Sequence, residues 1–493
     1  MYAQFLGFDL STTALSCGVR SVDGKEDFVS IPMQGKTMWN GQPAHDLDFV
    51  SGMILEALNK LEAMGWSFAS TDGALSLSVR QHDMVLLGSE NELLMPALSW
   101  QCVVAKAETN RLNSMPEIVS TVGKIEWRFI LPKLLWVFRK DKNIAKKVAR
   151  VMTTGDYIAA YLTGQFRLST SDGLSNGLLG QKDKRVPIRA LVGVYNLEAD
   201  GQKAFWALFP QPIQSGKLVG RVSNGLHPVE TCQAAEWLRI GIKLAGWQVI
   251  SSLGDNHAGG VGCGLADDNT IVISAGSSGT VIRKCKPSAK LAGKAACFEY
   301  YDDRLLLLML ADCADWYSKF ASWYSDNPNM AELDQLAMSA SPGELQFWPA
   351  TKRKSILKST RRRTQNLVAS AQFSIAVELL LLVRSMLKEA RGKIDNFVLT
   401  GGLSRSVFFR RVMGIGLNLL KRDTEIFVSN RSGPLASQAA TLGAMINAMV
   451  GSGAYEDLLS AISALCPQRP ILDANPSSLL ALRAVIRRAL KDN

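Results

Sequence analysis

Several features that define whole classes of proteins are missing from this chain of 493 residues. We expect no signal peptide, because Asp9 interrupts the only apolar N-terminal segment before a hydrophobic region of full length could form. No apolar run is expected to approach the roughly 18–20 residues of a membrane-spanning helix. The densest run, 305–311, is bracketed by Arg304 and Asp312. These absences argue against an exported or membrane-spanning protein and favour a cytoplasmic location.

The usual metal, redox and nucleotide motifs are also absent. The eight cysteines include no Cys-x-x-Cys, and only four histidines accompany them, which favours a reduced protein without a zinc site. No G-x-G-x-x-G or Walker-A sequence occurs, so a dinucleotide-binding Rossmann unit and a P-loop ATPase both lose support. The chain likewise lacks the HExxH and EF-hand signatures of zinc proteases and calcium sensors.

The composition is that of a globular protein, with 47% hydrophobic and 20% charged residues. A single core rarely grows beyond about 250–300 residues, so we expect two domains, 1–247 and 248–493. The net charge of +11 would suit an anionic substrate or nucleic acid, but part of it lies in one run, 352–363. That run contains no aromatic residue to stack on bases, and we interpret it as a solvated loop or helix face.

One pattern occurs twice in the chain. Residues 3–10 form an apolar, strand-like segment, followed by a hydroxyl-rich turn and a second apolar segment at 15–22. The same design returns at 270–284, where strand-like residues flank a turn of small residues. Helical spacing follows each hairpin, at 44–64 and at 366–391. The repetition predicts an α/β protein built from two cognate domains, each of which opens its sheet with a hairpin.

The two hairpin turns are candidates for phosphate binding. Successive backbone N–H groups in a tight turn form a concave anion site, and hydroxyl groups add donors. Either turn alone is better explained as an ordinary hairpin turn, but the equivalent positions of the two favour function. Asp9, just before the first turn, is suited to hold Mg²⁺ through water molecules. The candidate residues are Ser11, Thr12 and Thr13 in the first turn and Gly276, Ser277, Ser278 and Gly279 in the second.

Other candidates follow predicted strands. Asp255, with Asn256 beside it, begins a small-residue helix and is either a general base for a substrate hydroxyl or a helix N-cap. His82 is either a hydrogen-bond donor to substrate or a surface turn residue. Gly401 and Gly402 follow a strand and either let a flat ligand such as adenine approach the backbone or make a tight connection.

Taken together and in order, these segments resemble the FGGY carbohydrate kinases, and among them the xylulokinases. The resemblance rests on Asp9 to Thr13, the segment around His82, Asp255 with Asn256, and the glycine pair Gly401–Gly402. Further matching segments are 132–136, 156–158, 162–164, Asp172 with Asn176, 276–279 and 442–444.

This resemblance implies two actin-like (ribonuclease-H-type) domains with a ligand cleft between them. It also implies ATP on the C-terminal domain, the sugar on the N-terminal domain, and Mg²⁺ near Asp9. By resemblance Asp255 is the base, and the two turns hold phosphates. Sugar contacts are implied for Gln81, His82, Asp255 and Asn256, and nucleotide contacts for Gly401, Gly402 and Ser406.

The chain departs from the family's pattern on the sugar side and at one loop. Gln81 stands where xylulokinases commonly carry Met, and Gln101–Cys102 replaces an acidic sequence. The usual Gly-Glu-Arg-Thr-Pro loop is not recognisable in 348–358, and Leu403 is bulky where a small residue is common beside adenine.

We therefore expect retained kinase chemistry on a ketopentose such as D-xylulose, with ribulose, gluconate, glycerol or erythritol as alternative acceptors. A catalytically weak sugar sensor with the same fold is a second hypothesis, and nucleic-acid binding by the basic run is a third. The expected partner is a small-molecule sugar rather than nucleic acid or membrane, and a homodimer is among the expected assemblies.

Overall fold

The structure is a computed structural model that describes residues 4–69, 72–179, 207–223, 232–276, 278–293, 295–310, 313–353, 364–389, 392–429, 431–471 and 479–493. The chain divides into two compact units. Unit 1 comprises 1–262, 298–302 and 433–461, and unit 2 comprises 263–297, 303–432 and 462–493.

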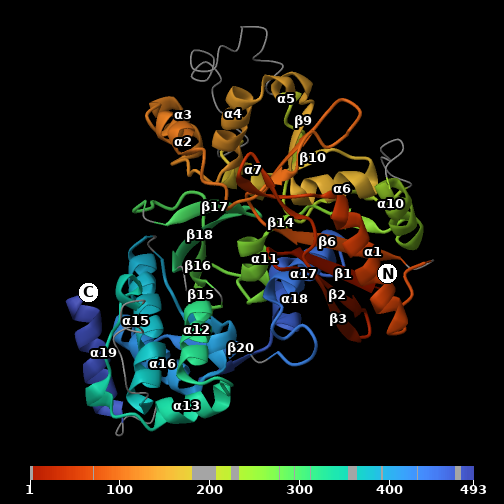
Figure 1. Cartoon of the computed structure of the whole chain (residues 1–493). Coiled ribbons are helices and arrows are strands. Elements are labelled where there is room, and N and C mark those ends of the chain that lie inside the picture. Colours follow the sequence, from red (N-terminus) through yellow and green to blue (C-terminus); the bar gives the residue numbers. More distant parts are fainter. Residues whose placement is uncertain are drawn as a thin grey trace. The chain divides into compact units, whose positions relative to one another are not determined.

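Unit 1 is built on a mixed sheet with the strand order β12-β13-β6-β1-β2-β3 (Figure 1). The pairs β1–β2 and β2–β3 are antiparallel, whereas β6 pairs in parallel with β1 on one side and with β13 and β14 on the other. The strands are β1 (Gln4–Leu10), β2 (Ala14–Ser21), β3 (Glu26–Pro32), β6 (Gly73–Val79), β12 (Leu218–Arg221), β13 (Gln248–Ile250) and β14 (Leu253–Gly254).

The first hairpin forms where the apolar pattern predicts it. Leu6, Phe8 and Leu10 on β1 are buried, as are Leu15 and Val19 on β2. Their side chains join one hydrophobic core with those of helix α1 (Asp48–Ala63), whose spacing of apolar residues presents one face to that core. The strand register therefore places Asp9, the last polar residue of β1, next to the turn that joins β1 to β2.

A second, five-stranded sheet and a set of helices complete unit 1. The sheet has the order β4-β5-β8-β7-β9. Its strands are β4 (Lys36–Trp39), β5 (Gln42–His45), β7 (Met84–Leu87), β8 (Ala97–Leu98) and β9 (Arg150–Thr153). The helices include α2 (Lys106–Asn113), α3 (Pro116–Val122), α4 (Ile130–Lys140), α5 (Lys142–Lys147), α6 (Thr154–Thr163), α7 (Thr170–Ser175), α10 (Cys232–Lys243), α11 (Asp255–Gly262) and α17 (Ala439–Gly451).

Unit 2 repeats the strand pairing of unit 1. Its sheet has the order β17-β18-β16-β15-β19-β20-β21, with antiparallel β15–β16 and β16–β18 pairs and parallel β15–β19 and β19–β20 pairs. The strands are β15 (Thr270–Ala275), β16 (Gly279–Cys285), β17 (Ala296–Tyr300), β18 (Asp303–Leu310), β19 (Asn396–Thr400), β20 (Glu425–Ser429) and β21 (Gln468–Pro470). The same sequence of antiparallel and parallel neighbours in both units confirms the predicted duplication.

Helices pack against this second sheet and supply its core. They include α12 (Ala314–Tyr324), α13 (Met330–Met338), α15 (Gln365–Glu389), α16 (Val407–Leu420) and α19 (Leu480–Asp492). The expectation that no apolar stretch approaches spanning length was wrong. Within the residues described, α15 alone is long and apolar enough for a membrane span, with a mean hydropathy of 1.8 over an 18-residue window. However, 72% of that window is buried inside the protein, so α15 is explained as a core helix.

The first boundary between the two units lies after residue 262, whereas the sequence analysis expected it after residue 247. Residues 248–262 belong to unit 1, because β13 and β14 pair with β6 and because α11 packs against α17. The α11–α17 contact is close at Gly443, where an added Cβ would lie 1.8 Å from the Ala258 carbonyl oxygen. Two helix backbones can approach this closely only where a side chain is missing.

We predict that Gly443→Ala destabilises unit 1 by about 1–3 kcal/mol, because the new methyl group must push the two helices apart. Gly414→Ala is the matched control, since Gly414 lies inside α16 with no atom within 4 Å of an added Cβ. Alanine favours helix over glycine by about 1 kcal/mol, so this variant should be neutral or stabilised. Urea unfolding of both variants measures the difference, and equal effects would contradict the helix-contact explanation.

Candidate functional site

Three parallel strand ends bring the polar candidates of unit 1 together. Asp9 on β1 lies opposite Ser78 on β6, and Val79 on β6 lies opposite Gly254 on β14. The next residue after β14 is Asp255, and the turn after β6 begins at Arg80. Because parallel strands end at the same edge of a sheet, Asp9, the turn 80–83 and Asp255 share one edge, where α/β proteins commonly bind ligands.

The Asp9 carboxylate is largely surrounded by protein atoms. Its Oδ1 accepts a hydrogen bond of 2.7 Å from the Ser78 hydroxyl. Burial raises the pKa of Asp9 to about 6, while the Ser78 hydrogen bond and the charge of Arg80 oppose the rise. Near neutral pH this carboxylate is therefore ionised, although its negative charge is poorly solvated. A bound cation would stabilise that charge.

Asp255 is the first residue of α11, and its Oδ1 accepts hydrogen bonds from the Asn256 backbone N–H (2.8 Å) and side-chain amide (3.3 Å). An N-cap carboxylate would accept from an N–H two or three residues further on, and Asp255 makes no such bond. The side chain keeps an exposed surface, yet the protein around it is dense. Desolvation raises the pKa of Asp255 to about 7, and repulsion from the Asp9 charge adds to the rise.

The first turn is organised mainly by Ser11. The Ser11 hydroxyl donates to the Ala14 carbonyl (3.0 Å) and accepts from the backbone N–H groups of Ala14 (3.1 Å) and Thr13 (3.3 Å). Its hydrogen-bonding capacity is thus used inside the turn. The exposed hydroxyl is that of Thr13, and Thr12 is partly exposed. The turn therefore offers Thr12 and Thr13 to a ligand more readily than Ser11.

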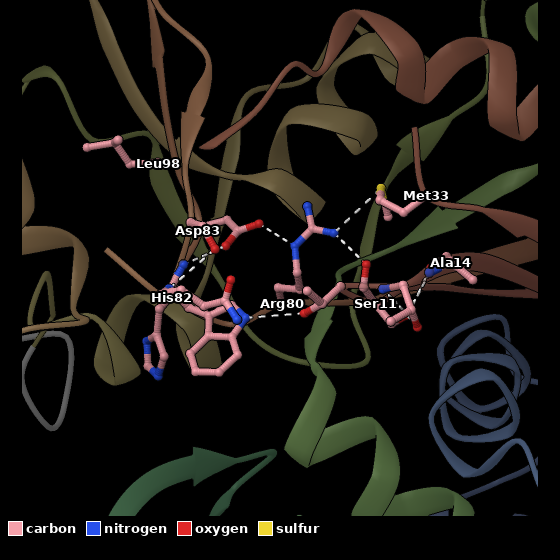
Figure 2. Close-up of polar contacts among 12 residues, drawn as sticks. Ser11, Ala14, Met33, Arg80, His82, Asp83 and Leu98 are labelled. Atoms are coloured by element: carbon pink, nitrogen blue, oxygen red, sulfur yellow. Dashed lines mark hydrogen bonds and ion pairs between the residues drawn. The ribbon is translucent and has the colours of Figure 1, made fainter. Parts of the chain in front are cut away.

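A ring of hydrogen bonds fixes this turn relative to the turn after β6 (Figure 2). The buried Arg80 guanidinium forms an ion pair with Asp83 and donates to the Ser11 carbonyl at 2.6 Å. Asp83 in turn accepts from the Trp100 backbone N–H at 2.9 Å, and the Trp100 indole N–H donates to Thr12 Oγ1 at 3.3 Å. Displacing one turn would consequently break bonds to the other.

Lys133 on α4 also stabilises the turn after β6. Its ammonium is fully buried and donates to the carbonyl oxygens of His82, Leu98 (3.4 Å) and Ser99 (3.3 Å). Burial lowers the pKa of Lys133 to about 8, an effect that the Asp83 charge partly offsets. This cation holds together the turn that carries His82 and the loop that carries Trp100.

The hydrogen bonds of Asn176 determine how His82 can act. The Asn176 amide donates to the carbonyl oxygens of Gln81 (2.7 Å) and Asp172 (2.8 Å), so its Oδ1 must face His82 Nδ1 at 3.0 Å. Nδ1 therefore carries the proton. Burial lowers the pKa of His82 to about 3, so the ring is neutral and Nε2 is an acceptor. In this state Nε2 is able to accept a hydrogen bond from a hydroxyl group, whereas the sequence analysis considered His82 as a donor.

Further buried polar side chains lie behind these residues. The Gln81 amide donates to Ser175 Oγ at 2.6 Å, whereas its Oε1 is buried with no partner in the described structure. Asp156 accepts from Thr153 Oγ1 (2.9 Å) and the Ser169 N–H (3.1 Å), and desolvation raises its pKa to about 7. Burial also raises the pKa of Asp172, as does the charge of Asp156.

The candidate residues of unit 2 also meet at one sheet edge. Ser274 on β15 lies opposite Thr400 on β19, which brings Gly401 against the turn after β15. An added Cβ at Gly401 would lie 2.7 Å from the Gly276 backbone nitrogen, and its φ of 87° also requires glycine. Gly402 has open space on its Cβ side, Gly279 begins β16, and Ser278 precedes it. Ser277 lies outside the described residues.

Other candidates of unit 2 have structural partners. Ser406 is the N-cap of α16, where its hydroxyl accepts from the Phe409 N–H at 2.9 Å and pairs with Asp334 and Gln372. This saturation favours a capping role for Ser406 over nucleotide contact. Leu403 is 6% exposed and belongs to the hydrophobic core, which explains its size.

The basic run is only partly described, since 354–363 lie outside the described residues. Arg353 contradicts the prediction of a solvated face, because it is buried in an ion pair with Glu378 and lies 4.8 Å from the centre of the Trp316 ring. Of the divergent pair near the sugar side, Gln101 is exposed and Cys102 is buried.

The site residues that sequence analysis missed are the structural ones, Arg80, Asp83, Trp100 and Lys133. The available signal was an Arg-x-x-Asp turn between two apolar strands, since charged residues in such a position must be paired if they are buried. The partners in the first turn and on α4 are distant in sequence, and no local pattern identifies them.

The donors at the edge of unit 1 fit a magnesium ion. Within the described residues no group of three or more His, Cys, Asp or Glu side chains could hold a metal ion. Mg²⁺ needs fewer protein ligands, because it keeps several waters and takes one or two carboxylates together with phosphate oxygens. Asp9 supplies such a carboxylate.

Comparisons with known proteins identify relatives of this chain. Residues 5–179 match the N-terminal domain of the FGGY family of carbohydrate kinases. The xylulose kinase of Escherichia coli (strain K12) is 26% identical over 277 residues, which cover 55% of this chain and 53% of that protein. The xylulose kinase of Lactococcus lactis is 23% identical over 356 residues, covering 69% and 65% of the two chains. The aligned regions thus span between about half and just under two thirds of the length of these relatives.

Solved structures establish the fold. A xylulose kinase of Lactobacillus acidophilus superposes with a TM-score of 0.78 at 18% identity, covering 99% of this chain and 97% of that one. A gluconate kinase from the same species gives a TM-score of 0.79 at 18% identity, covering 100% and 98%. The predicted pair of actin-like, ribonuclease-H-type domains is therefore confirmed.

We predict strong coupling between Arg80 and Asp83. Arg80→Met or Asp83→Asn should each cost about 3–5 kcal/mol of unfolding free energy, because each leaves its buried partner uncompensated. The double variant should cost clearly less than the sum of the two. Urea unfolding gives all three values.

The exposed pair Glu56–Lys60 on α1 is the matched control for this cycle. Its coupling should amount to only about 0.3–0.5 kcal/mol. If the free-energy changes at Arg80 and Asp83 were additive, with a coupling as small as that of the control pair, the ring would not be a fixed structural unit.

Proposed function

We propose that this protein is an ATP-dependent sugar kinase, because residues 5–179 match the N-terminal domain of the FGGY family of carbohydrate kinases. It transfers the γ-phosphate of ATP to a hydroxyl group of a ketopentose such as D-xylulose. The observation that carries the proposal is the pairing of Asp255, whose pKa is raised to about 7, with Asp9 at one strand edge. Xylulose kinases among the relatives support the choice of acceptor.

Asp255 serves as the general base in this proposal. A base works best when its pKa lies near the working pH, because it is then both ionised and able to accept a proton. Asp255 takes the proton from the acceptor hydroxyl as that oxygen bonds to the γ-phosphorus and the bond to ADP breaks. The neutral His82 Nε2 accepts a hydrogen bond from another sugar hydroxyl, and Gln81 and Asn256 are further sugar contacts in this proposal.

The two turns bind phosphate groups in this reaction. Thr12, Thr13 and the backbone N–H groups of the first turn belong to unit 1, and Gly276 to Gly279 belong to unit 2. Mg²⁺ held near Asp9 would neutralise charge on the transferred phosphate. Gly401 and Gly402 leave backbone accessible to the flat adenine ring. None of the seven described cysteines forms a disulfide, which supports a reducing, cytoplasmic setting.

The experiment is a measurement of ADP release from Mg-ATP with ketopentoses, aldopentoses, sugar acids, hexoses and polyols, including glycerol and erythritol. We expect one class of acceptor to respond, and we expect Asp255→Asn to lower its kcat by about 10²–10⁴-fold, the usual contribution of general-base catalysis. Sugar affinity measured by calorimetry should remain within a few-fold, because asparagine keeps the shape of the side chain.

Asp23→Asn is the matched control, since Asp23 is an exposed aspartate of the same unit. It should leave kcat unchanged. Sugar binding without ADP release by the folded wild type would instead identify a sugar sensor, and retained turnover in Asp255→Asn would remove the base assignment.

A further inference from the structure

A basic pocket lies in unit 2 and includes none of the candidate residues of that unit. The helices α15, α16 and α19 pack against one another (Figure 1). The pocket that they line has a volume of about 270 Å³. Its charged lining consists of Arg384 on α15, Arg422 just after α16, and three residues on α19, which are Arg483, Arg487 and Lys491. The remaining lining residues are Asn418, Leu419, Leu420 and Leu490, so none is acidic.

The cations of this pocket are almost without partners. Arg384 donates to the Leu490 carbonyl oxygen, and no ion pair of the described structure involves the other four. Arg483, Arg487 and Lys491 follow one another at intervals of four residues and so occupy one helix face. Like charges at this spacing repel each other and destabilise a helix. Among the residues that the structure describes, no ion pair neutralises this concentration of positive charge.

Helix ends explain only part of this charge. Cations stabilise the negative C-terminal end of a helix, which accounts for Lys491 at the end of α19 and Arg422 after α16. The same effect opposes Arg483, because it lies in the first turns of α19, where the helix dipole is positive. An anion between the helices would satisfy Arg483 and relieve the repulsion along α19.

We infer that this pocket binds a small anion with several negative charges, of the bisphosphate or pyrophosphate type. Arginine forks match phosphate oxygens in paired hydrogen bonds, and four of the five cations are arginines. The volume is below the roughly 300–1,000 Å³ of pockets for drug-sized ligands, which suits a compact ion. The proposal does not depend on the sugar kinase reaction.

The pocket is separate from the proposed nucleotide residues of the same unit. Ser406 and the glycine pair lie at the start of α16, and Asn418 to Leu420 lie at its end. With a rise of 1.5 Å per residue, the two ends of this helix are about 20 Å apart. An anion in the basic pocket is therefore not the phosphate group of a nucleotide held at Gly401.

The test is titration calorimetry of the full chain with inorganic pyrophosphate, comparing Arg487→Gln with Arg488→Gln. These adjacent arginines lie on the same helix and are both exposed, but only Arg487 lines the pocket. We expect wild-type binding that weakens with added salt, about tenfold weaker binding in Arg487→Gln, and unchanged binding in Arg488→Gln. Matching melting temperatures would show that both variants are folded.

Three results would overturn the inference. One is the absence of pyrophosphate binding at millimolar concentration. Another is equal weakening in both variants, which would mean diffuse attraction to a basic surface, as for nucleic acid. The third is binding that Arg487→Gln leaves unchanged, which would place the anion elsewhere, such as the proposed phosphate turns.

Discussion

Two carboxylates, Asp9 and Asp255, are held close enough at one edge of the first sheet to repel each other. The sheet imposes this proximity, since β1, β6 and β14 run in parallel and end together. Desolvation adds to the repulsion, and the pKa values rise to about 6 and about 7. Such crowding costs stability, and it gives one group the basicity needed to take a proton while leaving the other ready for a cation.

The surrounding structure holds the two carboxylates in place despite their repulsion. Arg80 contributes a compensating positive charge and ties the first turn to the turn after β6 through its bonds to Ser11 and Asp83. Lys133 performs a similar role for the loops that carry His82 and Trp100. A buried ion pair adds little net stability, but breaking it is costly, so these side chains chiefly enforce one arrangement. The residues that contact ligands in the proposed reaction are thus positioned by residues that do not.

Local patterns were sufficient to predict the repeated hairpins and the polar residues at strand ends, because alternation and strand termination are encoded within a few neighbouring residues. The resemblance to sugar kinases then chose between the alternative roles of Asp255 and of the glycine pair. Sequence alone did not reveal the partners of Arg80 and Lys133, since these contacts join segments far apart in the chain. It also misjudged α15, whose apolar character reflects burial on nearly all sides, and Arg353, whose neighbours in sequence suggested solvent.

The most direct test of the crowded edge is the pH dependence of stability in wild type and Asp255→Asn. A carboxyl group with a pKa of about 7 when folded and an ordinary value of 3.8 when unfolded binds protons more tightly in the folded state. Its contribution to stability is present at low pH and is lost as the pH rises through 7. The melting temperature of Asp255→Asn should therefore gain on that of the wild type between pH 5 and pH 8. A difference that stays constant, or that shrinks over this range, would contradict the account.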